Sequence, residues 1–160
     1  MKKHHLKIIR VLSWFVFAIY LVALVYFLFF SEQLGRVPCN EYKYSLVPFR
    51  EIRRYLVYRR EIGLYNVILN LLGNVLCFVP FGLVLPIMSR RHRGAVRITV
   101  LSFLASLLVE LIQLVSKVGS CDVDDIILNT LGGLLGYLIF WCCQRVVRYS
   151  VRKNLQKEKE

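Results

Sequence analysis

Hydrophobic residues in this chain fall into four long blocks that polar segments separate. Residues 11–31, 62–89 and 126–144 contain no charged residue, and the third block along the chain, residues 98–116, contains one, Glu110. A helix needs about 20 mostly apolar residues to cross a bilayer, and each block reaches about that length. The pattern therefore predicts four transmembrane helices, at about residues 11–31, 64–88, 97–116 and 125–144.

The composition favours a membrane protein over a soluble one. Hydrophobic residues make up 57% of the 160 residues, and a soluble domain of this size has too little interior to hide four apolar helices. The predicted fold class is all-α, a polytopic membrane protein. We expect a tail over residues 1–10, a four-helix membrane domain over 11–144 and a basic tail over 145–160.

Positive charges predict how the chain is oriented. Lys2, Lys3, Lys7 and Arg10 precede the first block, as in a signal peptide, but the block is longer than a signal-peptide core and we expect it to be retained. With four spans, both termini lie on one side, which carries 14 of the 22 Lys and Arg residues. This bias predicts cytoplasmic termini. The basic parts flank the spans, so we expect membrane lipids as partners and no nucleic acid.

Five cysteines show no C-x-x-C spacing, so they do not indicate a zinc site. Cys77, Cys142 and Cys143 lie in or beside apolar spans, where cysteine behaves as a small hydrophobic residue. Cys39 and Cys121 share the outer side of the predicted topology. Either they form a disulfide or they remain two thiols, and the second alternative is favoured.

Polar residues inside the spans are the candidates for function. In the second span Asn66, Asn70 and Asn74 are four residues apart and share one helix face. The third span carries Glu110 and Gln113 near its outer end. An ionisable residue inside a membrane span is costly and marks a functional site by default, although amides also bridge neighbouring helices.

All three aspartates of the chain lie together at the start of the fourth span. Asp122 and Asp124 either cap this helix, as carboxylates do at helix N-termini, or take part in a site. Asp125 falls inside the first turn, on the same face as Asn129. Helix packing or a kink is expected at four further positions, Pro80, Gly82, Gly132 and Gly136.

The depths of these polar residues agree. At a rise of about 1.5 Å per residue, three different helices place them in the same outer half of the membrane. We therefore expect one polar, acidic cleft that opens outward, lined by Asn70, Asn74, Glu110, Gln113, Asp122, Asp125 and Asn129. The long loop over residues 32–61 is available to cover it. Ile52, Tyr55 and Leu56 in this loop indicate either a short interfacial helix or a solvated loop.

Four stretches resemble the motifs of the VanZ-like family. They are "YSLVPF" (44–49), "NLLGNVLCFVPFGLVLP" (70–86), "VELIQLV" (109–115) and "DVDDIILNTLGGLLGY" (122–137). The resemblance implies a small polytopic membrane protein of the bacterial plasma membrane. Its polar motif positions fall on the expected cleft residues and on Pro80, Gly82 and Gly132. Many members have an arginine shortly before the aspartates, where this chain has "KVGSCD" with Lys117.

The family is named for a teicoplanin-resistance protein, so the resemblance implies reduced susceptibility to teicoplanin-type glycopeptide antibiotics. A lipoglycopeptide or a cell-wall precursor is then the expected partner of the cleft, and a homo-oligomer is compatible with it. Two alternatives stay open. One is an enzyme that acts on a lipid-linked envelope substrate through Glu110, Asp122 and Asp125, and the other is a small proton-coupled carrier. A non-enzymatic role is favoured, no cofactor is indicated, and the sequence leaves metal binding open.

Overall fold

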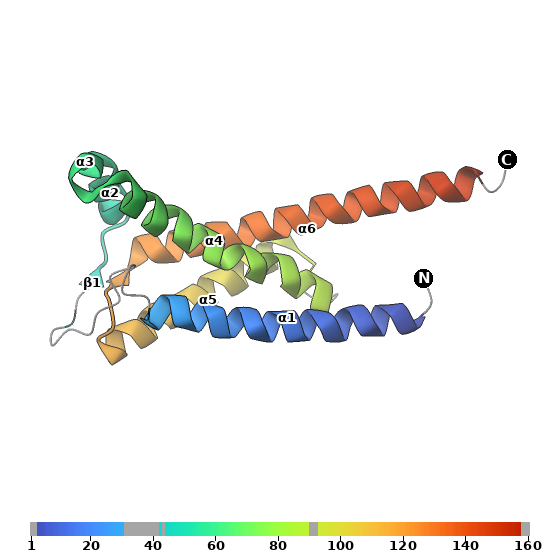
Figure 1. Cartoon of the computed structure of the whole chain (residues 1–160), viewed down its shortest axis with the longest axis horizontal. Coiled ribbons are helices and arrows are strands. Elements are labelled where there is room, and N and C mark those ends of the chain that lie inside the picture. Colours follow the sequence, from blue (N-terminus) through green and yellow to red (C-terminus); the bar gives the residue numbers. More distant parts are fainter. Residues whose placement is uncertain (1–2, 31–41, 43, 90–92, 158–160) are drawn as a thin grey trace.

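The computed structural model describes residues 3–30, 42, 44–89 and 93–157. Long helices dominate it, and a two-residue parallel strand pair and two short helices complete the described part (Figure 1). In chain order the elements are α1 (Lys3–Phe30), β1 (Tyr44–Ser45), α2 (Arg50–Val57), α3 (Arg59–Ile62), α4 (Leu64–Met88), α5 (Ala95–Ser116), β2 (Cys121–Asp122) and α6 (Val123–Lys157).

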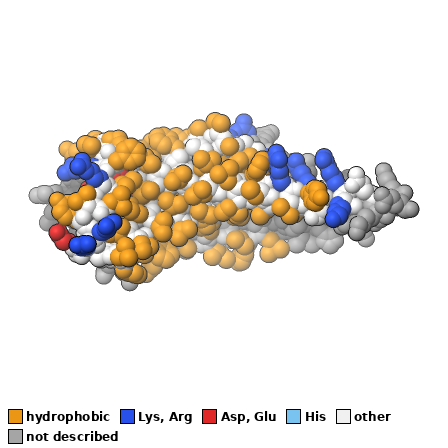
Figure 2. Space-filling model, turned by 90° about the horizontal axis from the view of Figure 1, so that it is seen from above, with side chains coloured by type: hydrophobic (Ala, Val, Ile, Leu, Met, Phe, Trp, Pro, Cys, Tyr) orange, Lys and Arg blue, Asp and Glu red, His pale blue; other side chains and the backbone are white. Residues whose placement is uncertain are grey.

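The four long helices confirm the all-α, four-span fold. Stretches long and apolar enough to cross a membrane are Val11–Phe29, Leu64–Met88, Ala95–Ser116 and Val123–Lys153. Large apolar side chains on these helices face outward, as a membrane protein requires, and Figure 2 shows this apolar surface with basic side chains toward its ends. The last helix is longer than expected, because residues 145–157 contain neither glycine nor proline to end it.

Glycines hold α4 and α6 in direct backbone contact. A Cβ atom added at Gly132 would lie 2.0 Å from the carbonyl oxygen of Val75, and one at Gly136 would lie 2.0 Å from that of Val79. From the other helix, a Cβ atom at Gly82 would lie 1.8 Å from the carbonyl oxygen of Gly133. Small residues allow such close approach between membrane helices.

The two prolines of α4 do not break it. The helix is continuous from Leu64 to Met88 with Pro80 and Pro86 inside. Near Pro80, the hydroxyl of Tyr20 in α1 donates a hydrogen bond to the carbonyl oxygen of Cys77 at 2.7 Å. This bond fixes α1 against α4 within the apolar part of the bundle.

Helix α1 packs along α4 through two apolar clusters. One contains Phe17 with Val84 and Met88, and the other contains Leu24, Leu28 and Phe78. The two chain ends lie at the same end of the bundle, and β1, α2 and α3 lie at the opposite end (Figure 1). The elements β1, α2 and α3 therefore gather where the aspartates begin α6.

Candidate functional site

The site is assembled by a short parallel strand pair. Tyr44 in β1 pairs with Cys121 in β2, and Ser45 pairs with Asp122. This pairing brings the "YSLVPF" segment against the start of α6. Ser45, Cys121 and Asp122 are all buried, so the junction is packed and not a surface contact.

A turn after β1 then starts α2. The N–H of Arg50 donates to the carbonyl oxygen of Val47 at 3.3 Å, and Phe49 has φ 63° and ψ 10°. Proline at the second turn position and a left-handed third residue are the features of a type II turn, which usually has glycine where this chain has Phe49. A bulky residue with positive φ is strained, so its surroundings must hold it in place.

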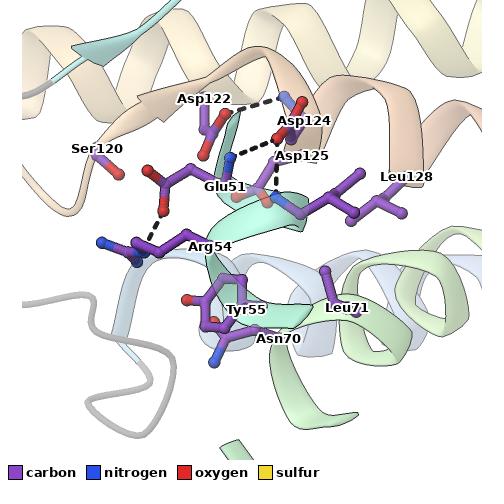
Figure 3. Close-up of a pocket in the computed structure, with 11 residues that line it drawn as sticks. Glu51, Arg54, Tyr55, Asn70, Leu71, Ser120, Asp122, Asp124, Asp125 and Leu128 are labelled. Atoms are coloured by element: carbon purple, nitrogen blue, oxygen red, sulfur yellow. Dashed lines mark hydrogen bonds and ion pairs between the residues drawn. The ribbon is translucent and has the colours of Figure 1, made fainter. Parts of the chain in front are cut away.

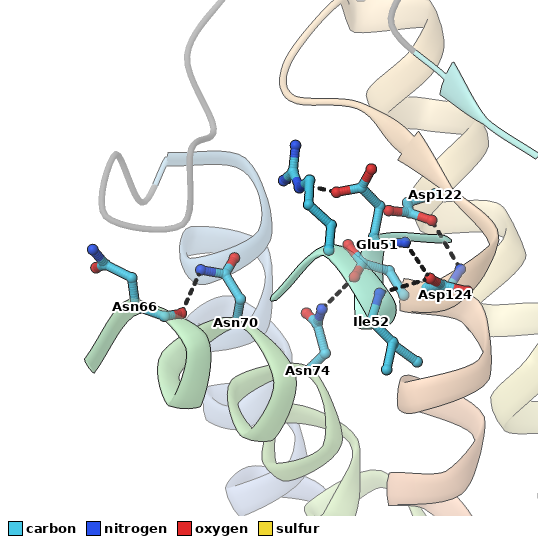
Figure 4. Close-up of polar contacts among 9 residues, drawn as sticks. Glu51, Ile52, Asn66, Asn70, Asn74, Asp122 and Asp124 are labelled. Carbon is cyan, nitrogen blue, oxygen red and sulfur yellow. Dashed lines mark hydrogen bonds and ion pairs between the residues drawn. The ribbon is translucent and has the colours of Figure 1, made fainter. Parts of the chain in front are cut away.

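The carboxylate of Asp124 supplies that restraint. It accepts a hydrogen bond from the backbone N–H group of Phe49 at 2.5 Å. It also accepts the N–H groups of Glu51 at 2.8 Å and Ile52 at 3.0 Å, which Figure 4 shows. These are the unsatisfied donors at the N-terminus of α2. Asp124 therefore caps a helix whose bonded residues lie 72 to 75 positions earlier in the sequence, although it stands in the first turn of its own helix α6.

Asp122 caps α6 itself. Its side chain accepts the backbone N–H of Asp124 at 2.9 Å, and its own N–H donates to the carboxylate of Glu110 at 2.8 Å. Burial raises the pKa of Asp122 from the usual 3.8 to about 7. The hydrogen bond from the Asp124 N–H lowers the pKa, whereas the neighbouring carboxylates of Asp125, Asp124 and Glu51 raise it further. Asp122 therefore exchanges its proton near neutral pH.

Asp125 joins α6 to α4. Its carboxylate accepts a hydrogen bond from the side-chain amide of Asn74 at 2.5 Å. The amide of Asn70 donates to the carbonyl oxygen of Asn66 within α4 (Figure 4), and the amide of Asn66 donates to that of Ile62 at the end of α3. The stripe thus has one deep member that contacts the aspartates and two members nearer the helix end.

A small polar pocket lies where α2 faces the start of α6 (Figure 3). We call it the carboxylate pocket. It has a volume of about 70 Å³, room for about two water molecules at their share of liquid volume. Its lining residues are Glu51, Ile52, Arg54, Tyr55, Asn70, Leu71, Ser120, Asp122, Asp124, Asp125 and Leu128.

The charge of the carboxylate pocket is mainly negative. Four of its lining residues carry carboxyl groups and one carries a guanidinium group, Arg54, which pairs with Glu51 at 2.7 Å. Such a site suits an amine or a hydroxyl-bearing group better than an anion. The described residues contain no group of three or more His, Cys, Asp or Glu side chains placed to hold a metal ion.

A family model described as VanZ/LLP1 matches residues 17–144. The chain belongs to the VanZ/LLP1 family. It is also 29% identical over 134 residues to Protein VanZ of Enterococcus faecium, with 82% of this chain and 74% of that protein covered. No solved structure matches the chain.

The VanZ/LLP1 match confirms the resemblance expected from the four motifs, and the matched segment contains the whole carboxylate pocket. Among the residues expected in the cleft, Asn70, Asp122 and Asp125 line this pocket. Asn74 contacts the pocket through its hydrogen bond to Asp125. Glu110 is only 1% exposed, and its carboxylate accepts the backbone N–H of Asp122.

Two expected cleft residues lie elsewhere in this VanZ/LLP1 member. The amide of Gln113 donates to the carbonyl oxygen of Leu28 in α1 at 2.7 Å, and the amide of Asn129 donates to the hydroxyl of Ser106 in α5 at 2.9 Å. Neither residue lines the carboxylate pocket. Both are buried between helices, where polar side chains join membrane spans.

Some residues that line the carboxylate pocket were not predicted from the sequence. Glu51, Arg54 and Tyr55 come from α2, the helix that was one of two alternatives for this part of the loop. Their spacing of three and four is the available signal, since it places them on one helix face. Cys39 lies outside the described residues, so both alternatives for Cys39 and Cys121, a disulfide or the favoured two thiols, stay predictions.

Proposed function

We propose that this VanZ/LLP1 member lowers susceptibility to teicoplanin-type glycopeptide antibiotics, without chemical turnover, from the outer face of the bacterial plasma membrane. The observation that carries the proposal is the carboxylate pocket, a negatively charged recess at the end of the bundle opposite the two termini. The positive-inside bias supports placing that end outside the cell. Teicoplanin-type antibiotics and the cell-wall precursors that they bind meet at this surface.

The size of the carboxylate pocket restricts what it binds. A volume of about 70 Å³ holds a single amine, a hydroxymethyl group or a sugar hydroxyl, and not a whole antibiotic. The ligand therefore inserts one polar group while its remainder lies over α2 and the membrane surface. Asp125 is the central contact in this proposal, because its carboxylate is held by Asn74 and lines the pocket.

The test is drug susceptibility in a sensitive Gram-positive host that expresses the protein. We expect a higher inhibitory concentration for teicoplanin and no change for vancomycin. Asp125→Asn keeps an oxygen acceptor for Asn74 but removes the charge, so it should abolish the rise. Glu61→Gln is the matched control, because Glu61 is an exposed carboxylate on α3 outside the pocket.

Membrane levels of all three proteins must be equal. If the inhibitory concentration of teicoplanin still rises with Asp125→Asn, the carboxylate pocket is not the site of action. If it does not rise with the unaltered protein, the resistance role is wrong.

A second candidate is an enzyme that acts on a lipid-linked envelope substrate. The pKa of Asp122 near 7 supports it, since a general acid or base works best when its pKa is close to the operating pH. Purified protein should then convert a labelled lipid-linked precursor, and Asp122→Asn should abolish that conversion. If the unaltered protein raises the inhibitory concentration of teicoplanin in cells but converts no precursor when purified, the binding role is favoured.

A further inference from the structure

Gly73 in α4 differs from the glycines that join α4 to α6. A Cβ atom added at Gly73 would meet no described atom within 4 Å, whereas one at Gly82 would collide with backbone. Glycine in a helix interior costs about 1 kcal/mol relative to alanine. Packing within the described part of the chain therefore does not account for Gly73.

The open space at Gly73 is part of an apolar groove between α1 and α4. We call it the α1–α4 groove, and its volume is about 300 Å³. The Tyr20–Cys77 hydrogen bond spans its inner end. The lining residues are Tyr20, Ala23, Leu24 and Phe27 from α1 and Leu69, Gly73, Leu76, Cys77 and Pro80 from α4.

The groove has the length of one membrane leaflet. Its α4 wall runs from Leu69 to Pro80, which at a rise of about 1.5 Å per residue spans about 16 Å. The hydrocarbon core of a bilayer is about 30 Å thick, so one leaflet contributes about 15 Å. A single alkyl chain lying parallel to α4 would follow the groove through its whole length.

Polar residues lie beside the groove wall near the start of α4. Asn66, Asn70, Gly73 and Cys77 are spaced four, three and four residues apart, so they share one face of α4. The two asparagines therefore stand next to the groove wall, toward the start of α4. Leu69 lines the groove and its chain neighbour Asn70 lines the carboxylate pocket, so the apolar groove and the acidic pocket lie on adjacent sides of this turn of α4.

We propose that the α1–α4 groove binds one alkyl chain of an amphiphile whose cationic head group lies at Asn70, beside the carboxylate pocket. The neighbouring positions of Leu69 in the groove and Asn70 in the pocket join the two parts, and the excess of carboxyl groups over the single Arg54 sets the charge of the head. The inference rests on the proposed function for its orientation, and it adds the class of ligand, a single-chain alkylammonium amphiphile.

Photo-crosslinking of the purified full-length protein in phosphatidylcholine nanodiscs tests this inference. The probe is a dodecylammonium with a diazirine in its chain, and the comparison probe is phosphatidylcholine with the same diazirine. Mass spectrometry should map dodecylammonium adducts to the groove residues of α1 and α4. Gly73→Leu fills the groove and should lower these adducts about tenfold, the change that 1.4 kcal/mol of binding free energy produces.

Two further variants complete the experiment. Leu76→Trp also fills the groove, so it tests the inference independently if Gly73→Leu lowers the thermal unfolding temperature. Leu72→Phe is the matched control, because the phenylalanine adds bulk to the exposed face of α4 outside the groove. This variant should be labelled like the unaltered protein. Equal dodecylammonium labelling of all variants would overturn the inference.

Phosphatidylcholine adducts at the groove that excess dodecylammonium does not reduce would also overturn it, because the groove would then be ordinary lipid-facing surface. A different result is expected if only the proposed function is wrong. In that case the dodecylammonium adducts and their loss in Gly73→Leu persist, although expression of the protein changes no antibiotic susceptibility.

Discussion

The carboxylate of Asp124 in α6 accepts the backbone N–H of Phe49 at 2.5 Å, and through this contact the start of one helix caps the start of another. The same carboxylate takes the N–H groups of Glu51 and Ile52. The helix that covers the carboxylate pocket is thus attached to the aspartates that line it. The position of α2 is therefore linked to the aspartates of the carboxylate pocket through the side chain of Asp124.

Asp124→Asn should loosen α2 from the bundle. The new amide NH₂ group has no lone pair for the backbone donors, so at least one of the three hydrogen bonds is lost. Hydrogen bonds to charged groups contribute about 1.5–3 kcal/mol, and an N-cap contributes about 0.5–2 kcal/mol. We expect a lower unfolding temperature and faster amide hydrogen exchange at Phe49, Glu51 and Ile52.

The control for this prediction is Glu61→Gln, which removes an exposed carboxylate from α3 without touching the N-terminus of α2. Exchange at residues 49–52 should be unchanged in it. If Asp124→Asn exchanges at these amides as slowly as the unaltered protein, the capping role is wrong.

Alanine at Gly82 and at Gly73 should have opposite effects. The Cβ atom at Gly82 would overlap the carbonyl oxygen of Gly133, which is backbone and cannot move without separating α4 from α6. Overpacking of this kind costs about 1–3 kcal/mol. At Gly73 the added methyl meets open space, and helix propensity favours alanine by about 1 kcal/mol.

Thermal unfolding of the two variants in the same detergent measures this difference. Gly82→Ala should unfold at a lower temperature than the unaltered protein, and Gly73→Ala at the same or a higher one. A similar decrease for both would mean that close contact between α4 and α6 does not depend on Gly82.

The sequence predicted the four spans well because bilayer crossing depends on local properties, length and hydrophobicity. It also predicted that Asn74 and Asp125 belong together, since helical spacing placed each on a polar stripe. Depth alone did not identify the partners of Gln113 and Asn129. Both lie in the half of their helices that is nearer the carboxylate pocket, but rotation about the helix axis directs them to Leu28 and Ser106 instead of the pocket.

The link between Asp124 and α2 was not predictable from local pattern. Helix capping was one expected role for Asp124, and the natural candidate was its own helix. The observed partner, the N-terminus of α2, is brought close by the pairing of Ser45 with Asp122. A two-residue strand pair leaves almost no periodic signal, so the contact becomes visible only in the folded chain.

The stability of the protein should depend on pH through Asp122. Its pKa is raised in the folded state, from the usual 3.8 to about 7, chiefly by burial. Between these values the folded state binds more protons than the unfolded state, so the stabilising contribution is full below pH 3.8 and is lost as the pH rises through 7. Asp122→Asn cannot titrate and should lack this component.

Unfolding temperatures of the unaltered protein and Asp122→Asn at pH 5 and pH 8 measure the effect. Relative to the variant, the unaltered protein should lose stability between the two pH values. A difference between the two proteins that stays constant from pH 5 to pH 8 would show that Asp122 does not titrate there.

Reporter fusions should find both chain ends in the cytoplasm. The side that holds the termini carries most of the basic residues, and positive loops are retained inside. A fluorescent protein fused after Glu160 should therefore fluoresce, and alkaline phosphatase fused there should be inactive. Fusion after Lys117 follows three spans and should give the reverse result, which controls for poor insertion. Active phosphatase after Glu160 with inactive phosphatase after Lys117 would place the carboxylate pocket inside the cell, where it cannot meet an antibiotic at the outer leaflet.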